Sequence, residues 1–202
     1  MVATLGVLLA GGRGSRLAHG VPKALVRVGG LTLLERSLVV LRAVCDEVVV
    51  VAPAELALPL DGMERVADPP GCEGPLGGLV AGLQARPCER AIVLAVDFPL
   101  MRPGMLRELA SRLASHAGVL PAPGGMLQPL AAVYAPWTAG RLAERLVAGE
   151  WAVVPAAALL GPRVVHDEEL ARLDGGLDCF LNLNGPEDRT HAEALLQSRV
   201  DA

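Results

Sequence analysis

A glycine-rich segment near the start of the chain carries the residues best suited to chemistry. The apolar run Thr4–Ala10 breaks abruptly into the segment Gly11–Ser15, and two positive charges, Arg16 and Lys23, follow shortly after it. A buried strand that ends in a loop rich in backbone N–H groups, with cations beside it, suits a polyphosphate. This arrangement points to nucleotide chemistry.

The spacing of the glycines excludes two common nucleotide-binding patterns. The loop lacks the later G-x-x-G step of the dinucleotide fingerprint and the G-K-[ST] ending of a Walker P-loop. The remaining pattern is Gly11–Leu17 followed by Pro22 and Lys23. It is either a turn with incidental charges or a triphosphate loop. Its position directly after the first expected strand favours the triphosphate loop.

A second candidate is Asp97, which follows the apolar run Arg90–Ala95. A carboxylate at the carboxyl end of a strand can hold Mg²⁺ against phosphate oxygens, although a lone aspartate can also cap a helix or a turn. Ligands of open α/β sheets bind outside the carboxyl ends of the strands, so Gly11 and Asp97 are expected to face one pocket. With the glycine loop beside it, Asp97 is predicted to be the metal ligand.

The elements that must position these residues alternate along the chain. A helix over residues 32–44 is expected to begin with Thr32 as N-cap and Glu35 in a capping box. The alternation predicts a single α/β domain, a Rossmann-like three-layer sandwich with a mostly parallel sheet. We expect strands at 4–10, 47–52, 63–67, 90–95, 119–120, 130–134 and 163–166, and further helices at 76–84, 104–115, 136–148 and 186–199.

Composition narrows the function classes. The net charge of −4 argues against a nucleic-acid binder, and no apolar run reaches the length of a membrane span. The four cysteines show no C-x-x-C spacing, which argues against a zinc site. We therefore expect a cytoplasmic protein without nucleic-acid or membrane partners. Lys23 is the only lysine among 18 basic residues, which raises interest in its role.

Two further segments combine small and polar residues. Glycines in Gly71–Leu79 permit close approach of the backbone to a ligand, or close packing of a helix on the sheet. Asn182 and Asn184 are expected to project to the same side of an extended segment and to offer amide groups to a polar ligand. The alternative for this pair is capping of the last helix.

Together these segments resemble those of a known enzyme family. Gly11–Lys23 resembles the G-x-G-[ST]-R-[LM]…P-K signature of nucleoside-triphosphate nucleotidyltransferases, and Asp97–Leu100 resembles their D-x-P segment. Gly74–Gly78 is similar to the G-P-L-[AG]-G segment of molybdenum cofactor guanylyltransferases of the MobA type, and Phe180–Asp188 to their F-x-N-x-N-[TS]-P-E-D segment. By these four ordered matches, the chain resembles the molybdenum cofactor guanylyltransferases of the MobA type.

The resemblance implies transfer of GMP from GTP to molybdopterin with Mg²⁺ as cofactor. It implies a nucleotide-binding half at 1–100, an acceptor-binding half at 101–202, and transient contact with proteins that handle the cofactor. The implied catalytic residues are Arg16, Lys23 and Asp97, with Asp97 as the metal ligand. The implied nucleotide contacts are Leu9, Ala10, Gly11, Gly12, Gly14, Ser15, Lys23, Asp68, Gly78 and Asp97, and the implied acceptor contacts are Gln128, Asn182 and Asn184.

Two departures from the family pattern keep alternatives open. The spacing of Pro22 and Lys23 is nearer to that of sugar-phosphate and methylerythritol cytidylyltransferases, and Ala52 and Pro53 stand where the family has an asparagine after the second strand. A cytidylyl- or sugar-phosphate nucleotidyltransferase is therefore the alternative enzyme. A non-catalytic nucleotide-binding regulator on the same fold is the alternative of a different class, and the presence of Arg16, Lys23 and Asp97 counts against it.

Overall fold

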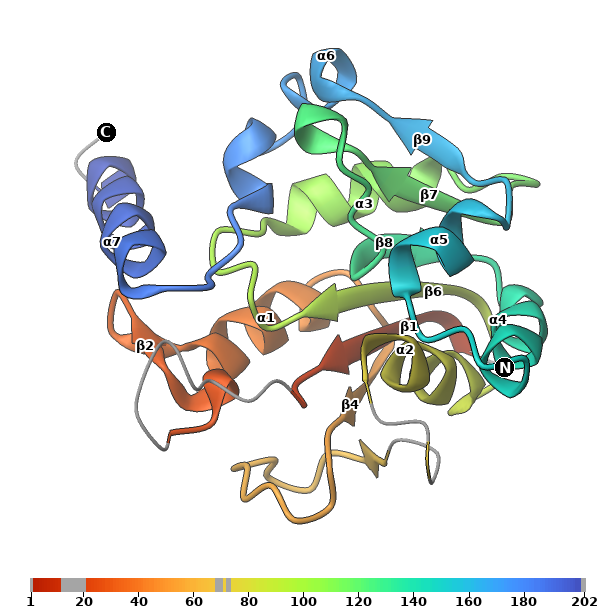
Figure 1. The fold of residues 1–202 in the computed structure, drawn as a ribbon. Helices are drawn as coiled ribbons and strands as arrows, with labels where there is room; N and C mark the ends of the chain where they lie inside the picture. The colour runs from red at the N-terminus through yellow and green to blue at the C-terminus, as the bar shows by residue number, and fades with distance from the viewer. Residues whose placement is uncertain (1, 12–20, 68–70, 72–73, 201–202) are drawn as a thin grey trace.

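A seven-stranded sheet forms the middle layer of the molecule (Figure 1). The structure is a computed structural model that describes residues 2–11, 21–67, 71 and 74–200. Strand β8 runs antiparallel to both of its neighbours, and the other pairings within the sheet are parallel. In spatial order the strands are β5 (Arg65–Val66), β4 (Glu47–Val51), β1 (Val2–Leu9), β6 (Cys88–Ala95), β8 (Ala131–Tyr134), β7 (Gly118–Pro121) and β9 (Arg163–Val165).

Helices cover both faces of the sheet and complete the predicted three-layer sandwich (Figure 1). One face carries α1 (Leu33–Arg42), α3 (Pro103–Ser111) and α7 (Pro186–Val200). The other carries α2 (Pro75–Gln84), α4 (Thr138–Val147) and α5 (Val153–Ala158). Shorter elements are the hairpin of β2 (Arg27–Val28) and β3 (Leu31–Thr32), helix α6 (Asp167–Leu170), and the 3₁₀ turns η1 (Lys23–Leu25), η2 (Pro123–Gly125) and η3 (Gly176–Phe180).

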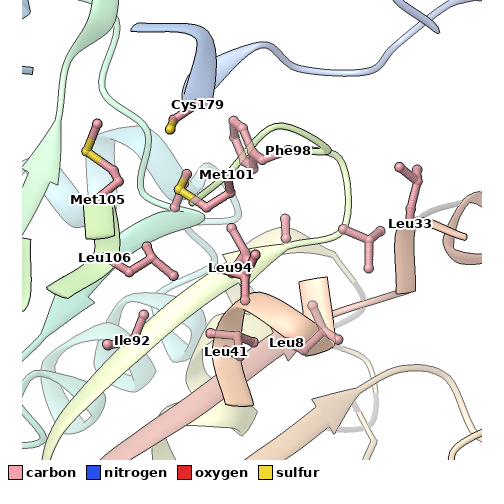
Figure 2. Close-up of a cluster of buried hydrophobic side chains, with 14 of the residues drawn as sticks. Leu8, Leu33, Leu41, Ile92, Leu94, Phe98, Met101, Met105, Leu106 and Cys179 are labelled. Carbon is pink, nitrogen blue, oxygen red and sulfur yellow. The ribbon is translucent and has the colours of Figure 1, made fainter. Parts of the chain in front are cut away.

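The core follows from the alternation of side chains along the central strands. Leu8 and Leu94 point to the face covered by α1 and α3, where Figure 2 shows them among Leu33, Leu41 and Leu106. Val7 and Val93, which precede them in the strands, belong to the opposite cluster under α2 and α4. Burial of one such leucine contributes about 1.5–3 kcal/mol. Because both faces are buried, the central strands are mostly apolar, and their charged residues, Glu47, Glu89 and Arg90, lie near the strand starts.

The expected capping box at the start of α1 is confirmed. The Glu35 N–H donates to Thr32 Oγ1 at 3.1 Å, and the Thr32 N–H donates to Glu35 Oε2 at 2.7 Å. The Thr32 N–H and the Thr32 hydroxyl both donate to the Glu35 carboxylate, which favours its charged form and holds the pKa of Glu35 below its usual value. The box fixes where α1 begins, directly after the β2–β3 hairpin.

Other boundaries differ from those expected. The strand expected at 63–67 is reduced to β5, and the helix expected at 104–115 ends at Ser111. The structure adds α5, α6 and the β2–β3 hairpin, which the sequence patterns did not predict, because these elements are too short to show a period. Within the described residues, no helix is both long and apolar enough to cross a bilayer.

Candidate functional site

A cavity of about 230 Å³ opens where β1, β4 and β6 end, at the edge of the sheet predicted to bind ligand. Five residues singled out in the sequence line it together: Leu9, Gly11, Lys23, Gly78 and Asp97. The other lining residues are Val51, Gly74, Pro75, Ala95, Val96 and Leu130. The cavity therefore has an apolar wall of strand ends and a polar end formed by Lys23 and Asp97.

Lys23 and Asp97 form an ion pair at the polar end of the cavity. Lys23 Nζ lies 3.4 Å from Asp97 Oδ2, and the two side chains are 13% and 21% exposed. Among the described residues, the second carboxylate oxygen, Asp97 Oδ1, is buried and has no hydrogen-bond partner. A buried acceptor without a partner costs about 1–3 kcal/mol. The orphaned oxygen is thus a free ligand position beside a cation.

This oxygen fits a divalent metal ion. Mg²⁺ prefers hard oxygen ligands and is usually held by one or two carboxylates together with phosphates and water. The described part of the chain holds no cluster of three or more metal-ligating His, Cys, Asp or Glu residues. A site built around one carboxylate agrees with a metal ion whose other ligands come from phosphate oxygens and water and not from the protein.

The backbone around Asp97 is held from both sides. The Val96 N–H donates to the Leu9 C=O at 3.1 Å, which continues the β1–β6 pairing to the cavity. On the other side, the Leu183 N–H donates to the Asp97 C=O at 2.8 Å. This contact places the C-terminal segment that contains Asn182 beside the backbone of Asp97.

Helix α2 begins at the cavity and lies tightly on the sheet. Gly74, with φ of 133°, precedes the helix, Pro75 occupies its first turn, and the Gly78 N–H donates to the Gly74 C=O at 3.0 Å. The partial positive charge of the helix N-terminus therefore faces the cavity. Farther along, a Cβ on Gly82 would overlap Val7, so the glycines serve both close packing and access to the cavity.

The residues predicted to bind the acceptor lie in different environments. Asn182 is half-buried and its Oδ1 has no partner among the described residues, whereas Asn184 is exposed. The N–H groups of Asn184 and Gly185 each donate to Asp188 Oδ2 at 2.8 Å, so part of this segment caps α7. The two asparagines are therefore not equivalent, and capping accounts for the backbone of Asn184.

Gln128 does not line the cavity, although Leu130, two residues later, does. Its Nε2 donates to the Met126 C=O at 3.4 Å, and its side chain is half-buried. Tyr134, in the same segment, is fully buried and its hydroxyl donates to the Pro129 C=O at 2.8 Å. Burial raises the pKa of Tyr134 above its usual value. Tyr134 is thus a core residue of β8.

Several predicted nucleotide contacts cannot be placed in this cavity. Ala10 is buried behind it, with its N–H bound to the Val51 C=O at 2.8 Å. The sequence reasoning did not select Val51, although the rule that ligands gather at strand ends points to it as the last residue of β4. Gly12, Gly14, Ser15, Arg16 and Asp68 lie outside the described residues.

The sequence matches a family described as the MobA-like NTP transferase domain over residues 6–168. A probable molybdenum cofactor guanylyltransferase of Chloroflexus aggregans is 34% identical over 95% of this chain and 94% of its own. A molybdenum cofactor guanylyltransferase of Desulfosudis oleivorans is 29% identical over 98% of both chains.

Solved structures share the fold. Molybdopterin-guanine dinucleotide biosynthesis protein A of Archaeoglobus fulgidus superposes with a TM-score of 0.79, 27% identity and coverage of 96% of this chain and 99% of that one. A 2-C-methyl-D-erythritol 4-phosphate cytidylyltransferase of Thermus thermophilus shows the same fold with a TM-score of 0.69, 22% identity and coverage of 97% and 98%. Because the family match spans most of the chain and the 34% identical relative aligns over nearly all of it, the chain belongs to the MobA-like NTP transferase family of nucleotidyltransferases.

Proposed function

We propose that the protein transfers GMP from GTP to molybdopterin and releases pyrophosphate. The observation that carries the proposal is the Lys23–Asp97 pair, which lies in a cavity at the strand ends. It is supported by the names of the relatives, which are molybdenum cofactor guanylyltransferases.

The proposed reaction is an in-line displacement at phosphorus. A terminal phosphate oxygen of the acceptor forms a bond to the α-phosphorus of GTP, and the bond from that phosphorus to the bridging oxygen of the leaving pyrophosphate breaks. The Lys23 ammonium offsets negative charge on the reacting phosphates, and the Gly11 backbone approaches them closely. Catalysis then rests on positioning and electrostatic stabilisation. The acceptor phosphate is already ionised, so the reaction needs no general base.

We propose that Asp97 binds Mg²⁺ through its unpartnered Oδ1. When bound, the metal would supply positive charge that neutralises phosphate oxygens and lowers the cost of charge build-up on the leaving group. The protein's part is to keep Oδ1 buried and aimed, while Oδ2 faces Lys23. Arg16 is proposed from the sequence as a second cation for the leaving group.

The two ends of the cavity suit two parts of the nucleotide. Leu9, Val51 and Pro75 offer apolar surface to the base, and Gly78 leaves room for the ribose or base beside α2. Proposed from the sequence alone are contacts of the nucleotide with Ala10, Gly12, Gly14, Ser15 and Asp68, and of the acceptor with Gln128, Asn182 and Asn184. We further propose that residues 1–100 bind the nucleotide and 101–202 the acceptor, that the reaction occurs in the cytoplasm, and that cofactor-handling proteins make transient contact.

Pyrophosphate release with each of GTP, CTP, ATP and UTP, with and without molybdopterin, tests the proposal. We expect release only with GTP and molybdopterin together. Turnover with CTP and a sugar- or erythritol-phosphate acceptor would establish the alternative transferase instead. GTP binding by calorimetry without pyrophosphate release would indicate a regulator. Lys23→Ala and Asp97→Ala should each lower turnover by about a hundredfold or more while the protein stays folded.

A further inference from the structure

The 3₁₀ turn that carries Lys23 precedes the β2–β3 hairpin, with Val26 between them. The Val26 N–H donates to the Lys23 C=O at 3.1 Å and closes the 3₁₀ turn that carries the lysine. The Leu33 N–H then donates to the Val26 C=O at 2.9 Å, so the turn is bound to the start of α1. Because the lysine side chain is long and flexible, its reach to Asp97 depends on a fixed backbone.

Arg36, one turn into α1, fastens the tip of this hairpin. Its Nε donates to the Val28 C=O at 2.7 Å, and its Nη2 donates to the Gly29 C=O at 3.1 Å. The guanidinium is half-buried, and burial lowers its pKa, since the charged form loses water. Within the described residues no carboxylate pairs with Arg36, so the contacts that compensate this burial are the two hairpin carbonyls.

Helix α7 also packs against the tip of the hairpin, at Gly29. A Cβ on Gly29 would lie 2.6 Å from Arg36 Nη2 and 3.0 Å from Leu196 Cδ1, so these three residues meet with no spare room. Figure 1 shows α7 standing beside β2. The segment that leads into α7 also holds Asp97, through the hydrogen bond from the Leu183 N–H. The C-terminal segment therefore contacts both the backbone of Asp97 and the hairpin that follows the Lys23 turn.

We propose that Arg36 is a positioning residue for Lys23: by fastening the hairpin to α1 and α7, it holds Lys23 Nζ against Asp97 Oδ2. Its effect on turnover rests on the proposed function, since it acts through the lysine that faces the phosphates. A displacement of about 1 Å of a catalytic group can cost roughly a hundredfold in rate. Arg36 thus contributes to catalysis although it does not line the cavity.

The single lysine of the chain makes this proposal directly measurable. An amine-reactive ester acylates Lys23 and the N-terminus, and mass spectrometry of the peptide between Arg16 and Arg27 reports Lys23 alone. In wild type we expect slow acylation, because the side chain is only 13% exposed and ion-paired. In Arg36→Gln the lysine should be acylated faster, and kcat should fall by about tenfold or more with a smaller change in the KM for GTP.

Arg42→Gln is the matched control. Arg42 lies on the same helix, but its Nη2 contacts Met63 Sδ at 3.1 Å and not the hairpin. In Arg42→Gln, Lys23 should be acylated at the wild-type rate and kcat should equal that of wild type. Arg36→Lys introduces a second lysine and is used for kinetics only, where one restored carbonyl contact should recover part of kcat.

A folded Arg36→Gln protein with wild-type acylation and wild-type kcat overturns the proposal. So does a loss of activity that merely follows the unfolded fraction while Lys23 acylation stays unchanged, since that indicates a structural role. If Arg36→Gln does not fold, Leu196→Ala is used to loosen the contact of α7 with Gly29 in the hairpin. Wild-type acylation and wild-type kcat in Leu196→Ala would then overturn the proposal equally. If wild type transfers no GMP, the proposed function fails, whereas the acylation rates still decide whether Arg36 positions Lys23.

Discussion

Replacement of Asp97 by asparagine removes one negative charge from the cavity and keeps the shape of the side chain. At the 3.4 Å separation from Lys23, and with an effective dielectric constant of about 20, the charge–charge attraction is on the order of 4–5 kcal/mol. Desolvation of both charges opposes that attraction, and the buried Asp97 Oδ1 without a partner adds a cost of about 1–3 kcal/mol. The asparagine oxygen can still accept from Lys23, so we expect Asp97→Asn to change the free energy of unfolding by no more than about 1–2 kcal/mol.

Turnover should respond much more strongly than stability. Loss of the charge that holds a metal ion against phosphate is expected to lower kcat by about a hundredfold or more. The two readouts are pyrophosphate release with GTP and molybdopterin, and unfolding in urea. Asp61→Asn is the control, because Asp61 is exposed, does not line the cavity, and has a φ of 44° that asparagine tolerates.

Thermal unfolding gives a third readout. A ligand present at about 100 times its dissociation constant stabilises the folded state by about 2.7 kcal/mol, which for a domain of this size raises Tm by roughly 5–10 °C. We expect Mg²⁺ added with GTP to raise the Tm of wild type and of Asp61→Asn, and the metal-dependent part of that rise to vanish in Asp97→Asn. Turnover within tenfold of wild type, or an unchanged Mg²⁺ response in folded Asp97→Asn, would refute the assignment of Asp97 as the metal ligand.

Three further predictions concern the scaffold. Gly82→Ala should destabilise the protein by about 1–3 kcal/mol in urea, because the added methyl meets Val7 and Val51, whereas Gly140→Ala, whose methyl meets nothing within 4 Å, should stabilise it by about 0.5–1 kcal/mol. Burial, with a contribution from Asp46, raises the pKa of Cys45 from 9.0 to about 12. The stability that this shift contributes is therefore complete below pH 9 and is lost as pH rises toward 12. Between pH 8 and pH 10.5, the free energy of unfolding in urea should fall less for Cys45→Ala than for wild type. Thr32→Ala should lose about 1 kcal/mol by thermal unfolding, since it removes the cap of α1.

Local signals in the sequence were sufficient for the central strands and for the start of α1. The four-valine run of β4 and the Thr32–Glu35 pair each specify structure within a few residues. The β2–β3 hairpin has strands of two residues each, too short for an alternating pattern. Its conformation is held by Arg36 and by Leu196 on α7, contacts that only the folded chain creates.

Some features of the candidate site could likewise be predicted from the sequence, and others could not. Gly11 and Asp97 could be brought together in advance, because both follow parallel strands and the carboxyl ends of such strands share one edge. The different environments of Asn182 and Asn184 could not be predicted from the sequence, because a spacing of two residues says only that they project to one side. The burial of Asn182 beside the residue that binds the Asp97 backbone depends on where the C-terminal segment packs.

The proposed nucleotide and acceptor halves are therefore not separable units. Strand β6 from the first half pairs with β8 from the second, so one sheet runs through both. The Leu183 N–H holds the Asp97 backbone, and Leu196 packs near Gly29 in the hairpin that follows the Lys23 turn. Residues of the proposed acceptor half thus contact the backbone of Asp97 and the hairpin next to Lys23.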